Sequence, residues 1–269
     1  MAYVTTNDGV KLYYEEAGSG DPIVFVHEFG GHHLSWETQM RFFSRRYRCI
    51  TYQARGWPPS DVPKSADAYS QERAADDIAD VMSGLGLTKA HVVGLSMGAT
   101  AGLEFAIRHP GKGLSITAAG AGTGSSRDPE QKKRFAAEAT AVAERIEKDG
   151  IKVLGDVYLN AASRQQLRLK DPRGFAEFHR QFVEGASEGR AYTMRGVQAK
   201  RLPFFEREAE LRATERFRDR DETEAQLDRG RLHIGGQRAR RLRLAHPGAQ
   251  RLRLLAGLGR QVDVDARRR

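Results

Sequence analysis

The chain has 269 residues and a formal net charge of +9, from 44 Lys+Arg and 35 Asp+Glu. This length accommodates one large α/β domain with an insertion, or two ordinary domains. The single cysteine, Cys49, excludes an intrachain disulfide, no stretch approaches the ~18 apolar residues of a membrane span, and the start of the chain lacks a signal-peptide pattern, so we expect a cytoplasmic protein.

Strand and helix signals alternate over the first 120 residues. Predicted strands lie at residues 3–6, 10–15, 23–26, around 49–50, 91–95 and 114–118. Predicted helices lie at residues 35–45 and 69–82 and directly after residue 96. Such alternation implies parallel crossovers, so the expected fold class is α/β, with a doubly wound, mostly parallel sheet.

After a Gly/Ser-rich linker at residues 120–126, helical patterns continue to about residue 196, with amphipathic stretches at 130–148 and 175–184. This block interrupts the β/α rhythm. We therefore expect an α/β core at 1–120, a helical cap domain at 121–196 and a C-terminal segment at 197–269 that becomes atypical and Arg-rich from about 213. The cap aromatics have helical spacing, which favours cap core over substrate contacts: Tyr158, Phe175, Phe178, Phe182 and Tyr192.

The pattern Gly94-Leu-Ser96-Met-Gly98 stands between a predicted strand and a predicted helix. A sharp strand-to-helix turn of this kind exposes a serine hydroxyl, and a side chain at either glycine would obstruct the turn. Ser96 is therefore the predicted nucleophile. Residues 185–189 also fit the pattern, but they follow a helical stretch, so Ser187 is predicted to be a chance match.

A second motif, His27-Glu-Phe29-Gly-Gly, follows the strand at 23–26. A loop in this place supplies one backbone donor of an oxyanion hole, so the N–H groups of Phe29 and Met97 are the predicted pair. A metal site formed by His27, Glu28 and the histidines at 32 and 33 is disfavoured, because the spacing is wrong and two glycines break any helix. We expect neither metal nor cofactor.

These motifs, together with the Arg55-Gly56 loop, resemble those of serine hydrolases of the α/β-hydrolase superfamily with helical caps, which include lactonases, esterases and carbon–carbon bond hydrolases. The resemblance covers residues 1 to about 212. It implies attack by Ser96 on a small-molecule carboxylic ester, lactone or related acyl substrate, since superfamily members with aspartate at this position are dehalogenases and epoxide hydrolases. Glu28 departs from the glycine usual after the loop histidine; the expected contact there is through backbone.

The superfamily order is Ser, then Asp or Glu, then His. Beyond residue 212 no convincing strand precedes the two histidines, His233 and His246, and the acids sit among arginines: Asp219, Asp221 and Asp228. Asp128 is an alternative acid placed one strand early. The proton acceptor therefore stays unassigned.

Two hypotheses address residues 201–269, which carry 18 Arg and 11 acidic residues but no Lys, Asn or Tyr. A shifted reading frame in a GC-rich gene produces this composition, and it would leave the enzyme without its acid and histidine. Alternatively, the chain is a non-catalytic, hydrolase-like binding protein whose Arg-rich tail contacts nucleic acid or an anionic surface. Mixed charge and a single aromatic after Phe205 disfavour nucleic acid, so the hydrolase hypothesis is preferred; no membrane partner is expected, and the oligomeric state is left open.

Overall fold

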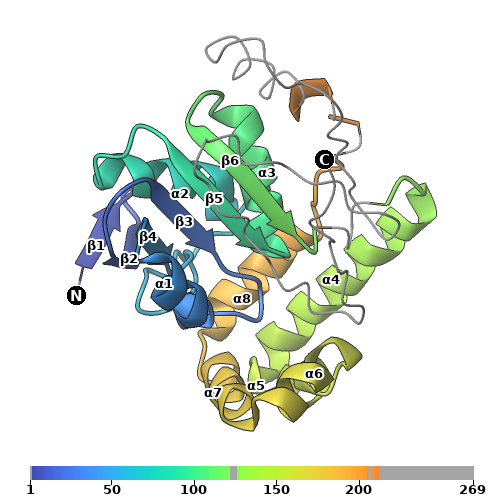
Figure 1. The fold of residues 1–269 in the computed structure, drawn as a ribbon. Coiled ribbons are helices and arrows are strands. Elements are labelled where there is room, and N and C mark those ends of the chain that lie inside the picture. Colours follow the sequence, from blue (N-terminus) through green and yellow to red (C-terminus); the bar gives the residue numbers. More distant parts are fainter. Residues whose placement is uncertain (1, 122–125, 205, 208, 212–269) are drawn as a thin grey trace, which may run out of the picture.

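A computed structural model describes residues 2–121, 126–204, 206, 207 and 209–211 (Figure 1). Most of the Arg-rich segment lies outside these residues. So do His233, His246 and the three tail aspartates, and the two hypotheses about the tail therefore stay predictions.

The core is a six-stranded sheet in the order β1-β2-β4-β3-β5-β6. Its strands are β1 (Ala2–Thr5), β2 (Lys11–Ala17), β3 (Pro22–Val26), β4 (Arg48–Tyr52), β5 (Ala90–Leu95) and β6 (Gly113–Ala119). The first two pair antiparallel around the predicted turn, and β2 pairs antiparallel with β4. The other pairings are parallel. The predicted doubly wound, mostly parallel sheet is confirmed.

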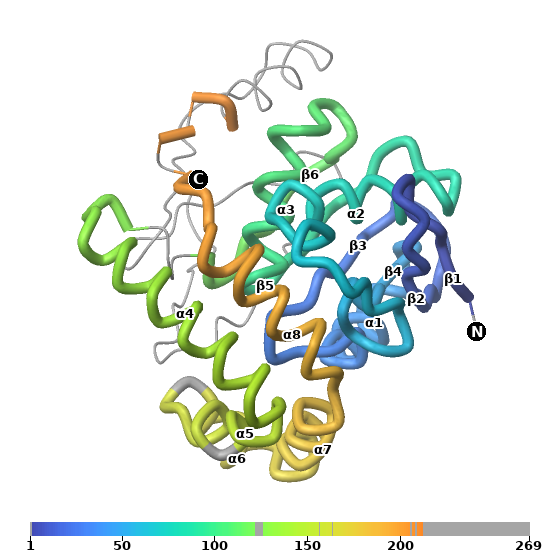
Figure 2. Tube along the Cα trace, turned by 180° about the vertical axis from the view of Figure 1, so that it is seen from behind, coloured from blue at the N-terminus to red at the C-terminus, as the bar shows by residue number. Residues whose placement is uncertain are grey.

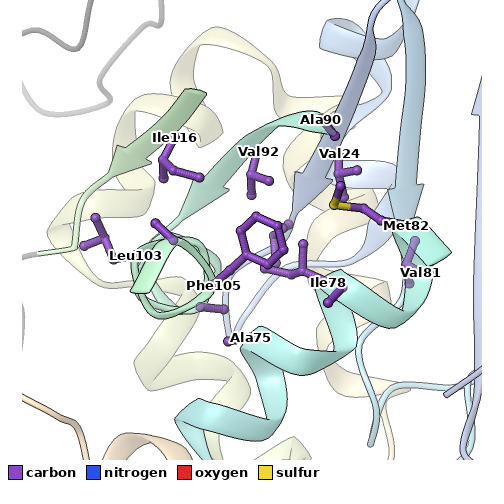
Figure 3. Close-up of a cluster of buried hydrophobic side chains, with 14 of the residues drawn as sticks. Val24, Ala75, Ile78, Val81, Met82, Ala90, Val92, Leu103, Phe105 and Ile116 are labelled. Carbon is purple, nitrogen blue, oxygen red and sulfur yellow. The ribbon is translucent and has the colours of Figure 1, made fainter. Parts of the chain in front are cut away.

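Helices cover both faces of this sheet because side chains of the apolar strands alternate between the two faces. Val24 and Val26 of β3 pack with α2 (Gln71–Gly84) and α3 (Met97–Arg108), whereas Ile23 and Phe25 pack with Trp36 on the opposite face. Trp36 belongs to η1 (His33–Trp36), which runs into α1 (Glu37–Phe43). Figure 3 shows Phe105 of α3 lying between Val92 and Ile78 in the larger of these clusters.

A helical segment follows β6 and lies beyond the carboxyl ends of the parallel strands (Figures 1 and 2). It comprises α4 (Pro129–Asp149), α5 (Lys152–Leu159), α6 (Ala162–Lys170), α7 (Pro172–Val183), α8 (Ser187–Thr193) and η3 (Met194–Gln198). A short turn, η2 (Ala66–Ala68), precedes α2 in the core. The predicted amphipathic stretches correspond to α4 and α7.

The side chains of the helical segment form their own apolar cluster, with Phe178 and Phe182 buried and the other three named aromatics packed against them. This agrees with the prediction that these aromatics form core. The cluster also contains Phe29, Trp57 and Met97 of the α/β core. The segment is thus joined to the loops at the carboxyl edge of the sheet.

None of the helices among the described residues combines enough length with enough apolar character to cross a bilayer.

Candidate active site

Ser96 stands at the turn between β5 and α3 with φ 52° and ψ −108°, and among the described residues it is the one non-glycine residue with positive φ. Such a conformation costs about 1–3 kcal/mol and is kept only where the surroundings enforce it. Here the Ser96 N–H donates to the Ala119 carbonyl (2.8 Å), and the Ser96 carbonyl accepts from the Thr100 N–H (3.1 Å). The hydroxyl makes no capping bond to its own helix.

The two glycines of the motif are required by close backbone approach. A Cβ at Gly94 would lie 2.1 Å from the Gly98 carbonyl oxygen, and one at Gly98 would lie 2.2 Å from the Val26 carbonyl oxygen. Backbone atoms cannot move aside as a flexible side chain can. The geometry is therefore that of the sharp strand-to-helix turn that the sequence predicted.

Two buried backbone donors border this turn. Met97 opens α3, where N–H groups of the first turn have no intrahelical acceptor, and the positive end of the helix dipole lies there. Phe29 lies in the loop after β3, and no hydrogen bond to its N–H is found within the described part of the chain. Both residues are 7% exposed. Buried N–H groups are normally paired, so these two are the natural donors to an acceptor that enters the site.

His27 is a structural residue of this loop. Its Nδ1 lies 2.8 Å from the Glu28 carbonyl oxygen, and its Nε2 accepts from the Ala54 N–H (3.1 Å). Burial lowers the pKa of His27 to about 3, so the ring is neutral and has its proton on Nδ1. With both nitrogens engaged, His27 joins the loops after β3 and β4.

The next two histidines lie beside each other, with ring centroids 4.2 Å apart. His33 is buried against Gln53 and Glu15, and His32 caps η1. Burial lowers the pKa of both rings, that of His32 to about 3. No group of three or more metal-ligating side chains is found in the described residues.

Glu28 is bound by the helical segment. Its carboxylate, on a residue that is 8% exposed, accepts from Arg164 Nη2 (2.7 Å), which also donates to the Tyr158 hydroxyl (2.9 Å). The Tyr158 ring lies where a Cβ of Gly30 would be, at 2.4 Å. Sequence inspection missed this cluster, because Glu28 and Arg164 are 136 positions apart. The replacement of the usual glycine at position 28 was the available signal.

Arg55 connects the loop after β4 to neighbouring elements of the core. It is 4% exposed, binds Asp77 of α2 through Nε and Nη2, and binds Asp8 in the β1–β2 turn through Nη1 and Nη2. Its Nη1 also donates to the Ala68 carbonyl. These bonds give Arg55 a stiffening role.

Among the described residues, no hydrogen bond joins the Ser96 hydroxyl to an imidazole or a carboxylate. Asp128, the alternative acid, is exposed and caps α4 by accepting from the Glu130 N–H (2.9 Å). His109 does pair with Asp76 (2.8 Å), but it follows the last residue of α3 whereas Ser96 precedes the first. Twelve helical residues separate them, about 18 Å along the axis.

A cavity of about 30 Å³ lies behind the turn and is lined by Val26, Trp57, Tyr69, Met97, Gly98 and Val197, among others. This volume holds about one water molecule.

The sheet topology and the strained turn at Ser96 are those of an α/β hydrolase. Comparison with known proteins agrees with this class. A family described as "alpha/beta hydrolase fold" matches residues 21–213. The chain belongs to this family.

Curated relatives match only part of the chain. Residues of this chain are 36% identical to epoxide hydrolase 3 of Mus musculus over 106 residues, which is 39% of this chain and 29% of that protein. They are 34% identical to the AB hydrolase superfamily protein YisY of Bacillus subtilis over 110 residues, 40% of each. The matches thus span well under half the length of these relatives.

Solved structures share the fold over a longer range. An enol-lactonase from Burkholderia xenovorans superposes with a TM-score of 0.62 at 24% identity, over 74% of both chains. A thermophilic esterase from Thermogutta terrifontis gives 0.65 at 24% identity, over 76% of this chain and 74% of that one. At this identity the likeness concerns the fold alone.

Proposed function

We propose that this protein is a serine hydrolase that cleaves a carboxylic ester, a lactone or a related small acyl substrate. One observation carries the proposal: Ser96 is held at positive φ directly before α3, and its hydroxyl makes no capping hydrogen bond. Close to it in the fold, the loop after β3 has a buried N–H group, that of Phe29, with no hydrogen bond among the described residues. A serine in this setting is suited to attack on a carbonyl carbon.

In the proposed reaction, Ser96 Oγ forms a bond to the substrate carbonyl carbon, and its proton passes to a general base. The N–H groups of Phe29 and Met97 stabilise the oxyanion of the tetrahedral intermediate, a contribution of about 3–4 kcal/mol for each donor. The C–O bond to the leaving alcohol then breaks, and the alcohol takes up the proton. Water hydrolyses the acyl-enzyme and restores Ser96.

The proposed arrangement has residues 1–120 as the core and residues 121–196 as a cap above the carboxyl edge of the sheet. The contact of Arg164 with Glu28 supports this position of the cap, because it attaches the cap to the loop that contains Phe29. The general base stays unassigned in this proposal. No step of the proposal uses a metal or a cofactor.

Epoxide hydrolysis is the competing activity, since epoxide hydrolases are among the relatives. The residue at the turn distinguishes the two. Superfamily members that open epoxides have aspartate there, because a carboxylate forms an ester that water can cleave. A serine attacking an epoxide would form an ether, which this machinery cannot hydrolyse.

The test is a substrate comparison with p-nitrophenyl butyrate, γ-butyrolactone and styrene oxide. We expect turnover of an ester or lactone above the rate in water, its loss in Ser96→Ala and its retention in Ser187→Ala, the matched change in the second Gly-x-Ser-x-Gly pattern. Opening of the epoxide, or activity indifferent to Ser96→Ala, contradicts the proposal.

A further inference from the structure

Arg190 of α8 is a buried charge without a matching countercharge. The residue is 1% exposed, it forms no ion pair within the described part of the chain, and its Nε has no hydrogen-bond partner there. Removing a guanidinium from water without a carboxylate partner is costly. Burial lowers the pKa of Arg190 to about 9, which leaves the group charged at neutral pH. Such a residue calls for an explanation.

Among the described residues, the one hydrogen bond of the Arg190 side chain is to the candidate oxyanion-hole loop. Its Nη1 donates to the Phe29 carbonyl at 2.8 Å. Its guanidinium carbon lies 4.5 Å from the centroid of the Trp57 ring and 5.3 Å from that of Phe182, so cation–π attraction replaces part of the lost hydration. Phe29, which Arg190 contacts, is also the residue whose own N–H has no hydrogen bond within the described part of the chain.

Backbone packing fixes where Arg190 lies. A Cβ at Gly189 would come within 2.2 Å of the Gly56 carbonyl oxygen, so α8 and the loop after β4 meet backbone to backbone. Gly189 is the last residue of the second Gly-x-Ser-x-Gly pattern. The pattern that is a chance match for catalysis thus contributes a glycine that brings the adjacent arginine against the loop.

The rest of the loop is held by other groups. The Glu28 carbonyl accepts from the Gly31 N–H at 3.0 Å and lies 2.8 Å from His27 Nδ1, and the Glu28 side chain is bound by Arg164. Arg190 holds the next carbonyl along. The Glu28 carbonyl shares a planar peptide group with the Phe29 N–H, and the Phe29 carbonyl belongs to the next peptide group. Holding both carbonyls therefore fixes Phe29 between two anchored peptide groups and leaves its N–H little freedom.

We propose that Arg190 is a positioning residue for the oxyanion hole: by holding the Phe29 carbonyl it fixes the peptide group that follows the Phe29 amide, and its charge, which forms no ion pair among the described residues, favours an anion at that amide. This rests on the proposed function. A fixed donor and a nearby cation in a water-poor site act on the charge that develops in the transition state, and much less on a neutral substrate.

The test uses Arg190→Met, which keeps an unbranched apolar side chain without the charge, and Arg190→Lys, which keeps the charge and a donor. Arg195→Met is the matched control, because Arg195 is a partly exposed arginine on η3 that pairs with Glu147. Hydrogen exchange of residues 27–33 reports on the loop directly. Affinity for a trifluoromethyl ketone, which forms a hemiketal oxyanion with serine, is compared with affinity for the corresponding methyl ketone.

For Arg190→Met we expect loop exchange about tenfold faster and trifluoromethyl ketone binding at least about tenfold weaker, as for loss of a charge-assisted contact, with methyl ketone binding little changed. Arg190→Lys should recover most of both, and Arg195→Met should match the wild type. Unchanged loop exchange, or equal weakening of both ketones, overturns the inference. A wild-type chain that forms no hemiketal at Ser96 overturns the proposed function instead, while loop exchange still decides whether Arg190 anchors the loop.

Discussion

At the scale of single residues, the turn at Ser96 exists because three backbones meet with no room for a side chain. Gly98 lies against the carbonyl of Val26 at the end of β3, and Gly94 lies against Gly98 itself. These contacts lock the first turn of α3 onto the sheet. The strain at Ser96 is maintained by that lock.

Gly98→Ala is expected to destabilise the fold by at least about 2 kcal/mol, because its methyl group would lie 2.2 Å from a backbone oxygen. The control is Gly102→Ala on the same helix, where the nearest atoms lie at 3.4 and 3.5 Å. The control should be neutral or stabilising, since alanine favours helix. Urea unfolding of the two variants measures both effects. Equal stability of the two would show that the turn at Ser96 is not held by these backbone contacts.

Sequence could predict Ser96, its two glycines and the loop of Phe29 as site residues because each belongs to a short local pattern. It could not identify Arg164 or Arg190, because their importance comes from contacts made across more than 130 positions. A buried arginine and an exposed one look the same in a sequence. The departure at Glu28 was the one local signal, and it did not indicate which residue would be the partner of this carboxylate.

At the scale of elements, two charged clusters tie separate elements together. Glu28 and Arg164 connect the loop after β3 with α6, and Arg55 connects the loop after β4 with α2 and the β1–β2 turn. Asp8 is exposed, whereas the other members of both clusters are largely shielded from water. Removal of one member therefore leaves a charge without its partner.

For the first cluster, a double-mutant cycle with Glu28→Gln and Arg164→Met is expected to give a coupling energy of about 1–3 kcal/mol, measured by urea unfolding. Either single substitution should lower the free energy of unfolding by more than the contact itself contributes, because it leaves the other buried group without its partner. Arg168→Met supplies a control, since Arg168 is an exposed arginine on the same helix. Additive effects of Glu28→Gln and Arg164→Met would mean that the pair does not bind the cap to the loop.

The second cluster makes stability depend on pH. The hydrogen bond from Arg55 holds the pKa of Asp8 well below its usual range, against the raising effect of burial. The folded state then binds fewer protons at Asp8 than the unfolded state does, so this contribution is complete above the unfolded pKa of about 4 and declines as pH falls below it. Asp77 has the opposite tendency, since burial raises its pKa.

Comparison with Asp8→Asn isolates the first effect. The wild type should exceed the variant in free energy of unfolding at pH 6, and this difference should shrink between about pH 4 and pH 2. Urea titrations across that range measure it. A difference independent of pH would show that the Asp8 charge does not support the fold.

The elements themselves were largely predictable. Apolar strands bounded by turns and helices of period 3.6 carry their pattern locally, and β1 to β6 and α1 to α4 fall where the sequence predicted them. Sequence located α7 as the stretch 175–184 but did not separate α5, α6 and α8. Local signals differ among these helices: α7 begins with Asp171 as its cap and Pro172 as its first residue, whereas α6 and α8 have no side-chain cap.

At the scale of the whole molecule, the sheet of the described residues ends at β6, and the family match ends at residue 213, where the composition changes. The strands that carry the acid and the histidine in the resembling hydrolases come after such a cap. The Arg-rich segment shows no pattern of this kind. We therefore keep the shifted reading frame as a proposal.

The gene decides this point. Translating the other two frames downstream of about codon 212 is expected to yield Gly-Asp-x-Asp followed by Gly-His. A chain made with that ending should hydrolyse the ester at least about 100-fold faster than the present one, as expected for gain of a general base. If both frames lack the two motifs, the shifted frame is wrong and the present tail is the protein's own.

The central claim is that Ser96 is the nucleophile, and reaction with a fluorophosphonate followed by peptide mapping tests it most directly. The account predicts a single label on Ser96 of the present chain. Labelling is expected even if it is slow, since a nucleophile with an oxyanion hole keeps about 10³–10⁴-fold acceleration over water without the complete triad. A label on any other residue, or none after prolonged exposure of the folded protein, would contradict it.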